Sequence, residues 1–155
     1  MNLKSKTLLI TGAAGRIGSE LARKASEENY DLVLTDISEE RLNILKANLN
    51  KKYNNKIYLI TCNLDSENQI NKLLKEAISH VGIIDNLVHC AYPTSKGWGT
   101  CLDEISEEYL KEDLFMQLGC SILLAKNIIQ HFQLNNSGNL IFISSIQGVQ
   151  SPKFD

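Results

Sequence analysis

Five short runs of mostly apolar residues recur along the chain, and longer segments with helical periodicity separate them. The runs cover residues 7–11, 31–36, 56–62, 85–90 and 139–144. Runs that are apolar throughout, instead of alternating with polar residues, are typical of strands buried on both faces of a parallel sheet. Because parallel strands joined through helices require right-handed crossovers, the chain is predicted to form a doubly wound α/β fold.

The intervening helices carry start signals in the expected places. Ser38 is a predicted N-cap, with acidic residues in the first turn after it. Ser66 and Gln69 have the spacing of a capping box. Further helices are predicted over residues 16–28, 106–111 and 113–133. No linker, repeat or low-complexity tract interrupts the pattern, so residues 1–155 are predicted to belong to one domain.

Composition narrows the classes of partner. A formal net charge of −2 gives no reason to expect nucleic acid or an anionic membrane surface. No apolar run approaches the roughly 18 residues of a membrane-spanning helix, and residues 8–10 are too few for a signal peptide, so the cytoplasm is the expected location. The four cysteines and three histidines lack metal-ligand spacing, which predicts no metal site and buried free thiols.

A glycine-rich turn directly follows the first apolar run. Residues 11–18 read TGAAGRIG, and they open the first predicted helix. Small residues between a strand and a helix let the backbone approach a pyrophosphate, which the N–H groups and the positive end of the helix dipole can bind. Because both the strand and the helix are in place, residues 11–18 are predicted to bind a dinucleotide as in a Rossmann-type sheet.

Asp36 closes the second run, about 20 residues after the glycine turn, where a carboxylate can bind the hydroxyl pair of a ribose. The carboxylate would repel a 2′-phosphate, so NAD is predicted in preference to NADP. The competing interpretation makes Asp36 only a helix-capping acid. Arg16 would favour NADP instead, because a guanidinium beside the turn can bind a phosphate. A solvated side chain is the simpler interpretation of Arg16.

With these features the whole chain resembles the short-chain dehydrogenase/reductase family. Residues 63–64 (NL) follow the third run, where the family often has an acidic residue at the adenine. Residues 89–92 (HCAY) stand where the family usually has NNAG, and residues 138–145 (GNLIFISS) resemble its fifth strand and catalytic serine. The resemblance implies a dinucleotide site made of Thr11, Gly12, Ala14, Gly15, Arg16, Ile17, Gly18, Asp36, Ile37, Asn63, Leu64, Cys90, Ala91 and Tyr92.

By the same resemblance, Ser145 is the serine that orients the substrate carbonyl while hydride moves to or from the nicotinamide. The family's Tyr-x-x-x-Lys pair should come later, but only ten residues follow Ser145 and none is tyrosine. Residues 92–96 (YPTSK) match the pair in letters, yet Pro93 disfavours the helix that the pair requires, so a loop position near the cofactor is expected for Tyr92. An asparagine that the family carries on its long helix is also missing; Gln117 is the nearest candidate, with Phe115 as an alternative alignment.

The resemblance therefore implies an NAD(H)-dependent oxidoreductase that moves hydride between nicotinamide and a hydroxyl or ketone of a small molecule. Residues 1–155 would be an incomplete Rossmann-type domain, truncated after the fifth strand and inactive alone, with a sticky apolar edge strand. The intact protein is expected to be a homo-oligomer. Residues 91–93 (AYP), 144–148 (SSIQG) and 152–154 (PKF) are similar to a bacterial subgroup associated with flagellin modification and nonulosonate-type sugar biosynthesis, which points to a sugar-derived substrate.

Two alternatives stay open. The spacing Thr-Gly-x-x-Gly-x-x-Gly is the form found in the family's extended branch of sugar-nucleotide epimerases and dehydratases, which keep NAD bound through the cycle. The missing Tyr-x-x-x-Lys pair would fit a non-catalytic nucleotide-binding or partner module.

Overall fold

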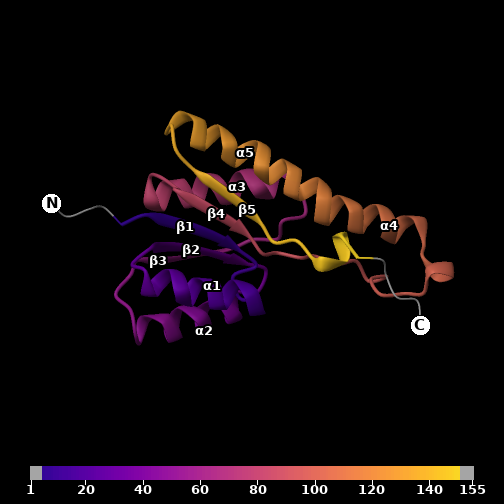
Figure 1. Ribbon diagram of the computed structural model, residues 1–155, viewed down its shortest axis with the longest axis horizontal. Helices are drawn as coiled ribbons and strands as arrows, with labels where there is room; N and C mark the ends of the chain where they lie inside the picture. Colours follow the sequence, from indigo (N-terminus) through magenta and orange to yellow (C-terminus); the bar gives the residue numbers. More distant parts are fainter. Residues whose placement is uncertain (1–4, 151–155) are drawn as a thin grey trace.

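Five strands, all parallel, form one sheet in the order β3-β2-β1-β4-β5. The computed structural model describes residues 5–150, apart from the side chains of Leu102 and Gln147. The strands are β1 (Thr7–Thr11), β2 (Asp31–Asp36), β3 (Ile57–Thr61), β4 (Asn86–His89) and β5 (Asn139–Phe142). This order is that of a doubly wound sheet, so the predicted fold class is confirmed (Figure 1).

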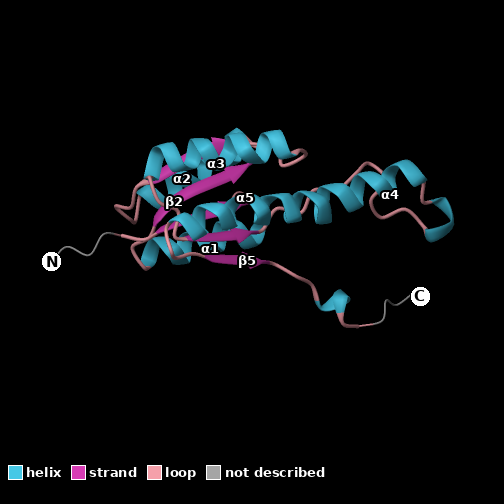
Figure 2. Cartoon of the chain, turned by 90° about the horizontal axis from the view of Figure 1, so that it is seen from above, coloured by secondary structure: helices cyan, strands magenta, loops and turns pink. Residues whose placement is uncertain are grey.

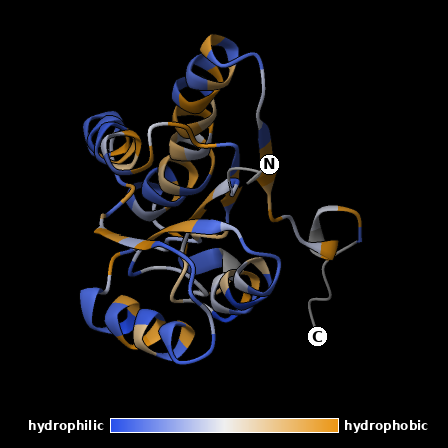
Figure 3. Ribbon diagram, turned by 90° about the vertical axis from the view of Figure 1, so that its left-hand side faces the viewer, coloured by the Kyte–Doolittle hydropathy of each residue, from blue (hydrophilic) through white to orange (hydrophobic). Residues whose placement is uncertain are grey.

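Helices cover both faces of the sheet (Figure 1). The helices α1 (Arg16–Glu27) and α2 (Glu39–Asn50) pack on one face, and α3 (Glu67–Val81) and α5 (Cys120–Leu134) pack on the other. Both predicted serine caps form, because the hydroxyl oxygens of Ser38 and Ser66 accept hydrogen bonds from the backbone N–H groups of Arg41 and Gln69. Figure 3 shows hydrophobic and hydrophilic residues on each of these helices, as expected for one packed and one solvated face.

The last helical segment differs from the prediction of two helices with a break near residue 112. Helix α4 (Glu107–Leu114) continues through a π turn, η2 (Phe115–Gly119), directly into α5, and the three form one long arm that extends beyond the sheet (Figure 2). Gly119 keeps helical backbone angles, φ −59° and ψ −51°. The helix does not end at the predicted break, because the backbone stays hydrogen-bonded through the π turn, where Cys120 N donates to the carbonyl oxygen of Phe115.

Only the central strands meet the expectation of burial on both faces. Residues of β1 are buried throughout, whereas β3 is partly exposed and β5 is mostly exposed. Ile141 and Phe142 of β5 expose 51% and 42% of their surface, because β5 pairs only with β4 and lies at the edge of the sheet. The apolar edge expected from the sequence is therefore present.

The prediction of buried thiols was correct for Cys120 alone. Cys62 and Cys90 are half-buried, and Cys101 is exposed in the loop before α4. All four cysteines are free. Within residues 5–150, no helix is long and apolar enough to cross a membrane, and no group of three potential ligands among His, Cys, Asp and Glu is placed to hold a metal ion.

Candidate functional site

A cavity of about 540 Å³ opens at the carboxyl ends of β1 to β4. The cavity lies where the strand order reverses: β2 and β3 follow β1 on one side of it, and β4 and β5 lie on its other side. Ligands of doubly wound folds bind at this kind of crevice. The residues lining the cavity are Gly12, Gly15, Thr35, Asp36, Ile37, Cys62, Asn63, Leu64, Cys90, Ala91, Tyr92, Pro93, Thr94 and Met116.

Nine of the residues assigned to dinucleotide binding from sequence therefore meet in one cavity, although they come from four strand ends. The others belong to the glycine turn itself but do not line the cavity: Thr11, Ala14, Arg16, Ile17 and Gly18. Five lining residues were missed. Thr35 and Cys62 are adjacent in sequence to predicted site residues, and Pro93 and Thr94 continue the loop that begins at Tyr92. Their positions in the sequence could therefore have identified them. Met116 lies on the π turn and had no signal in the sequence.

The glycine turn packs tightly against the end of β4. Gly12 has φ +62°, and a Cβ there would lie 2.7 Å from the backbone N and Cα of Ala91. A Cβ on Gly18 would lie 2.3 Å from the carbonyl oxygen of Gly12. Hydrogen bonds from Ala13 N to Thr35 O and from Gly15 N to Gly12 O, both 3.0 Å, fix the turn. Side chains at positions 12 and 18 would therefore displace the backbone that forms the cavity floor.

Helix α1 begins at this cavity without a side-chain cap. Its N-cap is Gly15, and its first turn contains no acidic residue. By contrast, α2, α3 and α4 each have a serine hydroxyl that accepts a hydrogen bond from the first turn. An uncapped helix start leaves N–H donors and a positive dipole end for an anionic ligand. The cavity floor thus has the geometry and charge that a pyrophosphate requires.

Asp36 is fixed at the edge of the cavity by two backbone donors. Its carboxylate accepts hydrogen bonds from Ala14 N at 3.0 Å and from Ser38 N at 3.2 Å. The Arg41 guanidinium donates to the carbonyl oxygen of Ala14, so a cation borders the same turn. Asp36 therefore organises the turn as well as facing the cavity, while the helix cap itself is Ser38.

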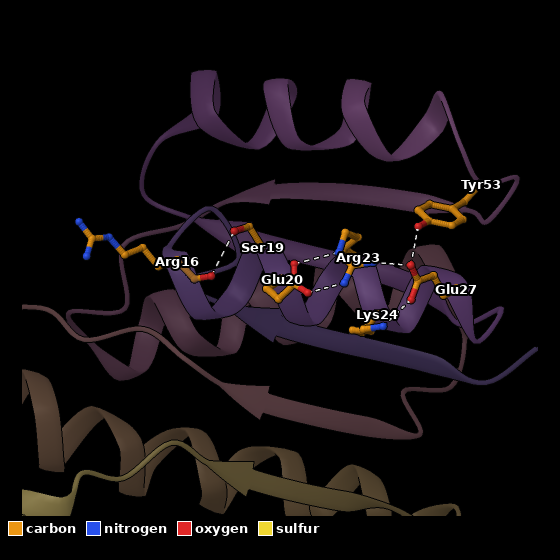
Figure 4. A network of polar contacts seen from close by, with 7 residues as sticks. All are labelled: Arg16, Ser19, Glu20, Arg23, Lys24, Glu27 and Tyr53. Atoms are coloured by element: carbon orange, nitrogen blue, oxygen red, sulfur yellow. Dashed lines mark hydrogen bonds and ion pairs between the residues drawn. The ribbon is translucent and has the colours of Figure 1, made fainter.

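Arg16 stands apart from the other charged residues of α1. Figure 4 shows Glu20, Arg23, Lys24 and Glu27 joined by ion pairs along the helix, with the Tyr53 hydroxyl donating to Glu27. The Arg16 guanidinium points away from this network, and it makes no ion pair with any residue between 5 and 150 (Figure 4). The simpler interpretation of Arg16, an exposed side chain at the helix start, describes this geometry.

His89, at the end of β4, joins three elements beneath the cavity. Its Nδ1 lies 2.7 Å from the Thr11 hydroxyl, and its Nε2 lies 3.2 Å from the Ser121 hydroxyl on α5. The Phe142 ring packs edge-on against the imidazole, with ring centroids 5.5 Å apart. The side chain is 7% exposed, and burial lowers the pKa of His89 to about 4. The imidazole is therefore neutral at physiological pH.

This burial predicts a pH dependence of folding. The ring titrates near pH 6.5 when unfolded and near pH 4 when folded, so the unfolded chain binds the proton first as the pH falls. The contribution of the neutral His89 ring to the free energy of unfolding is fully present above pH 6.5. It is lost as the pH falls through about 4, and the total loss is about 3 kcal/mol. Urea titrations across this window will measure it. An equal pH slope in His89→Asn, which cannot titrate, would contradict the assignment.

Of the remaining sequence candidates, Tyr92 lines the cavity, whereas Ser145, Gln117 and Phe115 do not. Ser145 follows β5 and is exposed, and its carbonyl oxygen accepts a hydrogen bond from Gly148 N at 3.0 Å. Gln117 lies in the π turn, where its side-chain amide donates to Pro93 O at 3.2 Å, while Phe115 is exposed. Tyr92 is in a loop at the cavity rim, as predicted, and packs edge-on against Trp98. Residues 152–154 lie outside the described part of the chain.

Known proteins match this chain at the levels of sequence and fold. Residues 6–154 match the family described as short chain dehydrogenase. Post-translational flagellin modification protein A of Campylobacter coli is 33% identical over 154 residues, which are 99% of this chain and 60% of that protein. The chain thus spans about three-fifths of the length of this curated relative.

Solved structures share the fold. A xylitol dehydrogenase bound to NAD+ superposes with a TM-score of 0.86 at 22% identity, covering 98% of this chain and 57% of that one. An actinorhodin polyketide ketoreductase with NADPH gives a TM-score of 0.86 at 23% identity, covering 96% and 56%. The family match extends over nearly every residue, including the glycine turn, Asp36 and the strand before Ser145. The chain belongs to the short-chain dehydrogenase family of oxidoreductases.

Proposed function

We propose that this chain is the dinucleotide-binding part of an oxidoreductase that transfers hydride between NAD(H) and a hydroxyl or ketone of a small substrate. The observation that carries the proposal is the glycine turn, whose close backbone packing joins an uncapped helix start to the cavity at the sheet's switch point. The bound nicotinamide supplies or accepts the hydride. In this proposal the residues of the chain bind the dinucleotide and orient the substrate.

Each part of the cavity has a role in this proposal. Gly12 and Gly15 admit the pyrophosphate to the start of α1, and Asp36 binds the adenosine ribose. Ile37, Asn63 and Leu64 surround the adenine, and Cys90, Ala91 and Tyr92 border the path toward the nicotinamide. Thr11, Ala14, Arg16, Ile17 and Gly18 support the turn from outside the cavity.

NAD is our proposed cofactor in preference to NADP. The Asp36 carboxylate faces the cavity and would repel a 2′-phosphate. Arg16 and Arg41 supply positive charge near the same turn, and the structural neighbours include both an NAD+ complex and an NADPH complex. Asp36 decides the preference in this proposal because two backbone N–H groups hold its carboxylate in place.

Ser145 is proposed to orient the substrate carbonyl. The proposal is supported by its position three residues after Phe142, the last residue of β5, since the cavity also opens at the carboxyl ends of the strands. No helix among the described residues carries a Tyr-x-x-x-Lys pair that could move the proton, so we propose that this step belongs to a longer natural protein, of which residues 1–155 form the cofactor domain and are inactive alone. The substrate is proposed to be sugar-derived, since residues 144–148 resemble the flagellin-modification subgroup.

Ser145→Ala in the natural protein is expected to lower kcat by roughly 100- to 1000-fold, since one donor to a developing oxyanion has this effect in other enzymes. The comparison variant is Tyr92→Phe, because the phenyl ring keeps the place of Tyr92 in the cavity lining and loses only the hydroxyl, which is not a proton donor in this proposal. Its kcat should stay within about threefold of the natural enzyme. Steady-state kinetics with NADH measure both, and the reverse pattern would place the chemistry at Tyr92.

One alternative function has a specific observation in its favour. The Thr-Gly-x-x-Gly-x-x-Gly spacing of the turn supports an epimerase or dehydratase of the extended branch. Such an enzyme would co-purify with tightly bound NAD and would show no net turnover of NADH. The alternative of a non-catalytic nucleotide-binding module is supported only by the missing Tyr-x-x-x-Lys pair. Turnover by the natural protein would contradict it.

The first experiment is an intact mass of the natural protein combined with NADH binding followed by fluorescence. A mass well above 17.4 kDa together with binding would support a whole dehydrogenase with this chain as its cofactor domain. A mass of 17.4 kDa with binding would support the non-catalytic alternative. Failure to bind NADH at either mass would overturn the assignment of Gly12, Gly18 and Asp36.

We further propose a cytoplasmic homo-oligomer. The free cysteines support a reducing compartment, and the formal net charge of −2 supports a small-molecule partner over a nucleic acid or a membrane surface. One side of the long helical arm carries the apolar residues expected of an interface between subunits. These exposed residues are Leu110, Leu114, Phe115, Leu118 and Ile122. Light scattering on the natural protein tests this proposal, and a monomer would contradict it.

A further inference from the structure

A chain of buried and half-buried hydrogen bonds runs from Ala91 beside the cavity to the π turn. The Ser121 hydroxyl donates to the carbonyl oxygen of Gln117 at 2.5 Å, so the Ser121 oxygen is left to accept a hydrogen bond from His89 Nε2–H. His89 Nδ1 must then accept from the Thr11 hydroxyl, whose oxygen in turn accepts from Ala91 N at 3.4 Å. The donor and acceptor positions are thus determined along the whole chain.

These hydrogen bonds end at the π turn, which forms part of the cavity wall. The π turn carries Met116, which lines the cavity, and Gln117, whose side chain donates to the carbonyl oxygen of Pro93, another lining residue. A π turn disturbs the regular backbone hydrogen bonds of the helix, and the Ser121 hydroxyl satisfies the Gln117 carbonyl oxygen. Ser121 therefore contacts the same π turn that carries Met116 and that donates to Pro93.

We propose that His89 is a positioning residue that, by bridging Thr11 and Ser121, holds the π turn against the dinucleotide cavity and so places Met116 and Pro93 in its wall. The inference rests on the proposed function only for the identity of the ligand. His89 replaces the first asparagine of the segment that usually reads NNAG, and one asparagine amide cannot span the two hydroxyls that the imidazole nitrogens reach. The bridge is thus specific to the imidazole ring.

The test compares three variants of the natural protein. His89→Asn keeps an acceptor for Thr11 but loses the donor to Ser121, and Ser121→Ala removes the same bond from the other side. Each is expected to weaken NADH binding by roughly three- to tenfold. The double variant should be no weaker than either single variant, because both remove one shared interaction. Unchanged binding, or losses that multiply in the double variant, would overturn the inference.

A control separates positioning from general destabilisation. Ile128→Val removes one methyl group from a fully buried residue of α5 that does not line the cavity, so it should lower Tm without changing the Kd for NADH. If Ile128→Val weakens NADH binding in proportion to its loss of Tm, as the His89 and Ser121 variants do, the effect is only structural and the inference fails.

A second readout does not depend on NADH. The methyl signal of Met116, assigned with Met116→Leu in protein labelled at its methionine methyl groups, should shift in the same way in His89→Asn and Ser121→Ala. Should the natural protein not bind NADH, the proposed function fails while this signal still tests the bridge. A Met116 signal unmoved in both variants would overturn the inference, and a common shift would support it.

Discussion

Gly12→Ala is expected to abolish useful NADH binding, weakening it by about a hundredfold, and to cost about 3 kcal/mol in the free energy of unfolding. Two effects add at this position. Gly12 has φ +62°, which costs an L-residue energy, and its Cβ would lie 2.7 Å from the Ala91 backbone. Because the backbone N–H groups of Cys90 and Ala91 donate to the Thr11 carbonyl and hydroxyl oxygens, Ala91 is held in place and the turn must move instead, so that its N–H groups leave the cavity. Fluorescence titration with NADH and urea unfolding measure the two effects.

Gly82→Ala is the matched control for backbone conformation. Gly82 has φ +76°, but nothing lies within 4 Å of the position that its Cβ would occupy. Its variant should lose about 1–2 kcal/mol of stability and keep its affinity for NADH. Equal losses of NADH affinity in the two variants would show that stability, and not the packing of the turn on β4, governs binding.

Asp36→Asn is expected to weaken NADH binding by roughly 10- to 100-fold and to reduce the preference for NADH over NADPH. The Asn side chain keeps an acceptor for only one of the two backbone donors, Ala14 N and Ser38 N, because they bind different carboxylate oxygens, and it cannot offer a charged acceptor to a ribose or repel a phosphate. Titration with both dinucleotides gives the two affinities. If NADH binding is lost while the ratio of the NADH and NADPH affinities stays the same, Asp36 serves only the geometry of the turn.

Asp31→Asn is the corresponding control, because Asp31 lies at the other end of the same strand. Its carboxylate accepts hydrogen bonds from the Ser5 hydroxyl and from Lys56 N, far from the cavity. The substitution removes the same charge and should leave both dinucleotide affinities unchanged. A similar loss in Asp31→Asn would trace the effect of Asp36 to net charge or to the stability of β2.

The edge of the sheet marks where the periodicity of the sequence was less informative. Residues of β5 are as apolar as those of β1, yet β1 is buried throughout and Ile141 is half exposed. Apolar side chains show that a strand can be buried, but the elements that pack against it determine how much of its surface is buried. The same reason explains the cysteines, since the thiols of Cys62 and Cys90 lie half-buried beside the cavity instead of in the core.

The sequence by itself determined the parallel sheet, its helices and the glycine turn, because strand and helix periods, serine caps and the spacing of Gly12, Gly15 and Asp36 are local properties of the chain. Tertiary structure alone decided the rest. The π turn, the placement of Met116 in the cavity wall and the bridge from His89 to Ser121 all depend on which distant segments pack together. Residues 89 and 121 are 32 positions apart, and no local pattern couples them. Only the packing of α5 on β4 brings their side chains within hydrogen-bond distance.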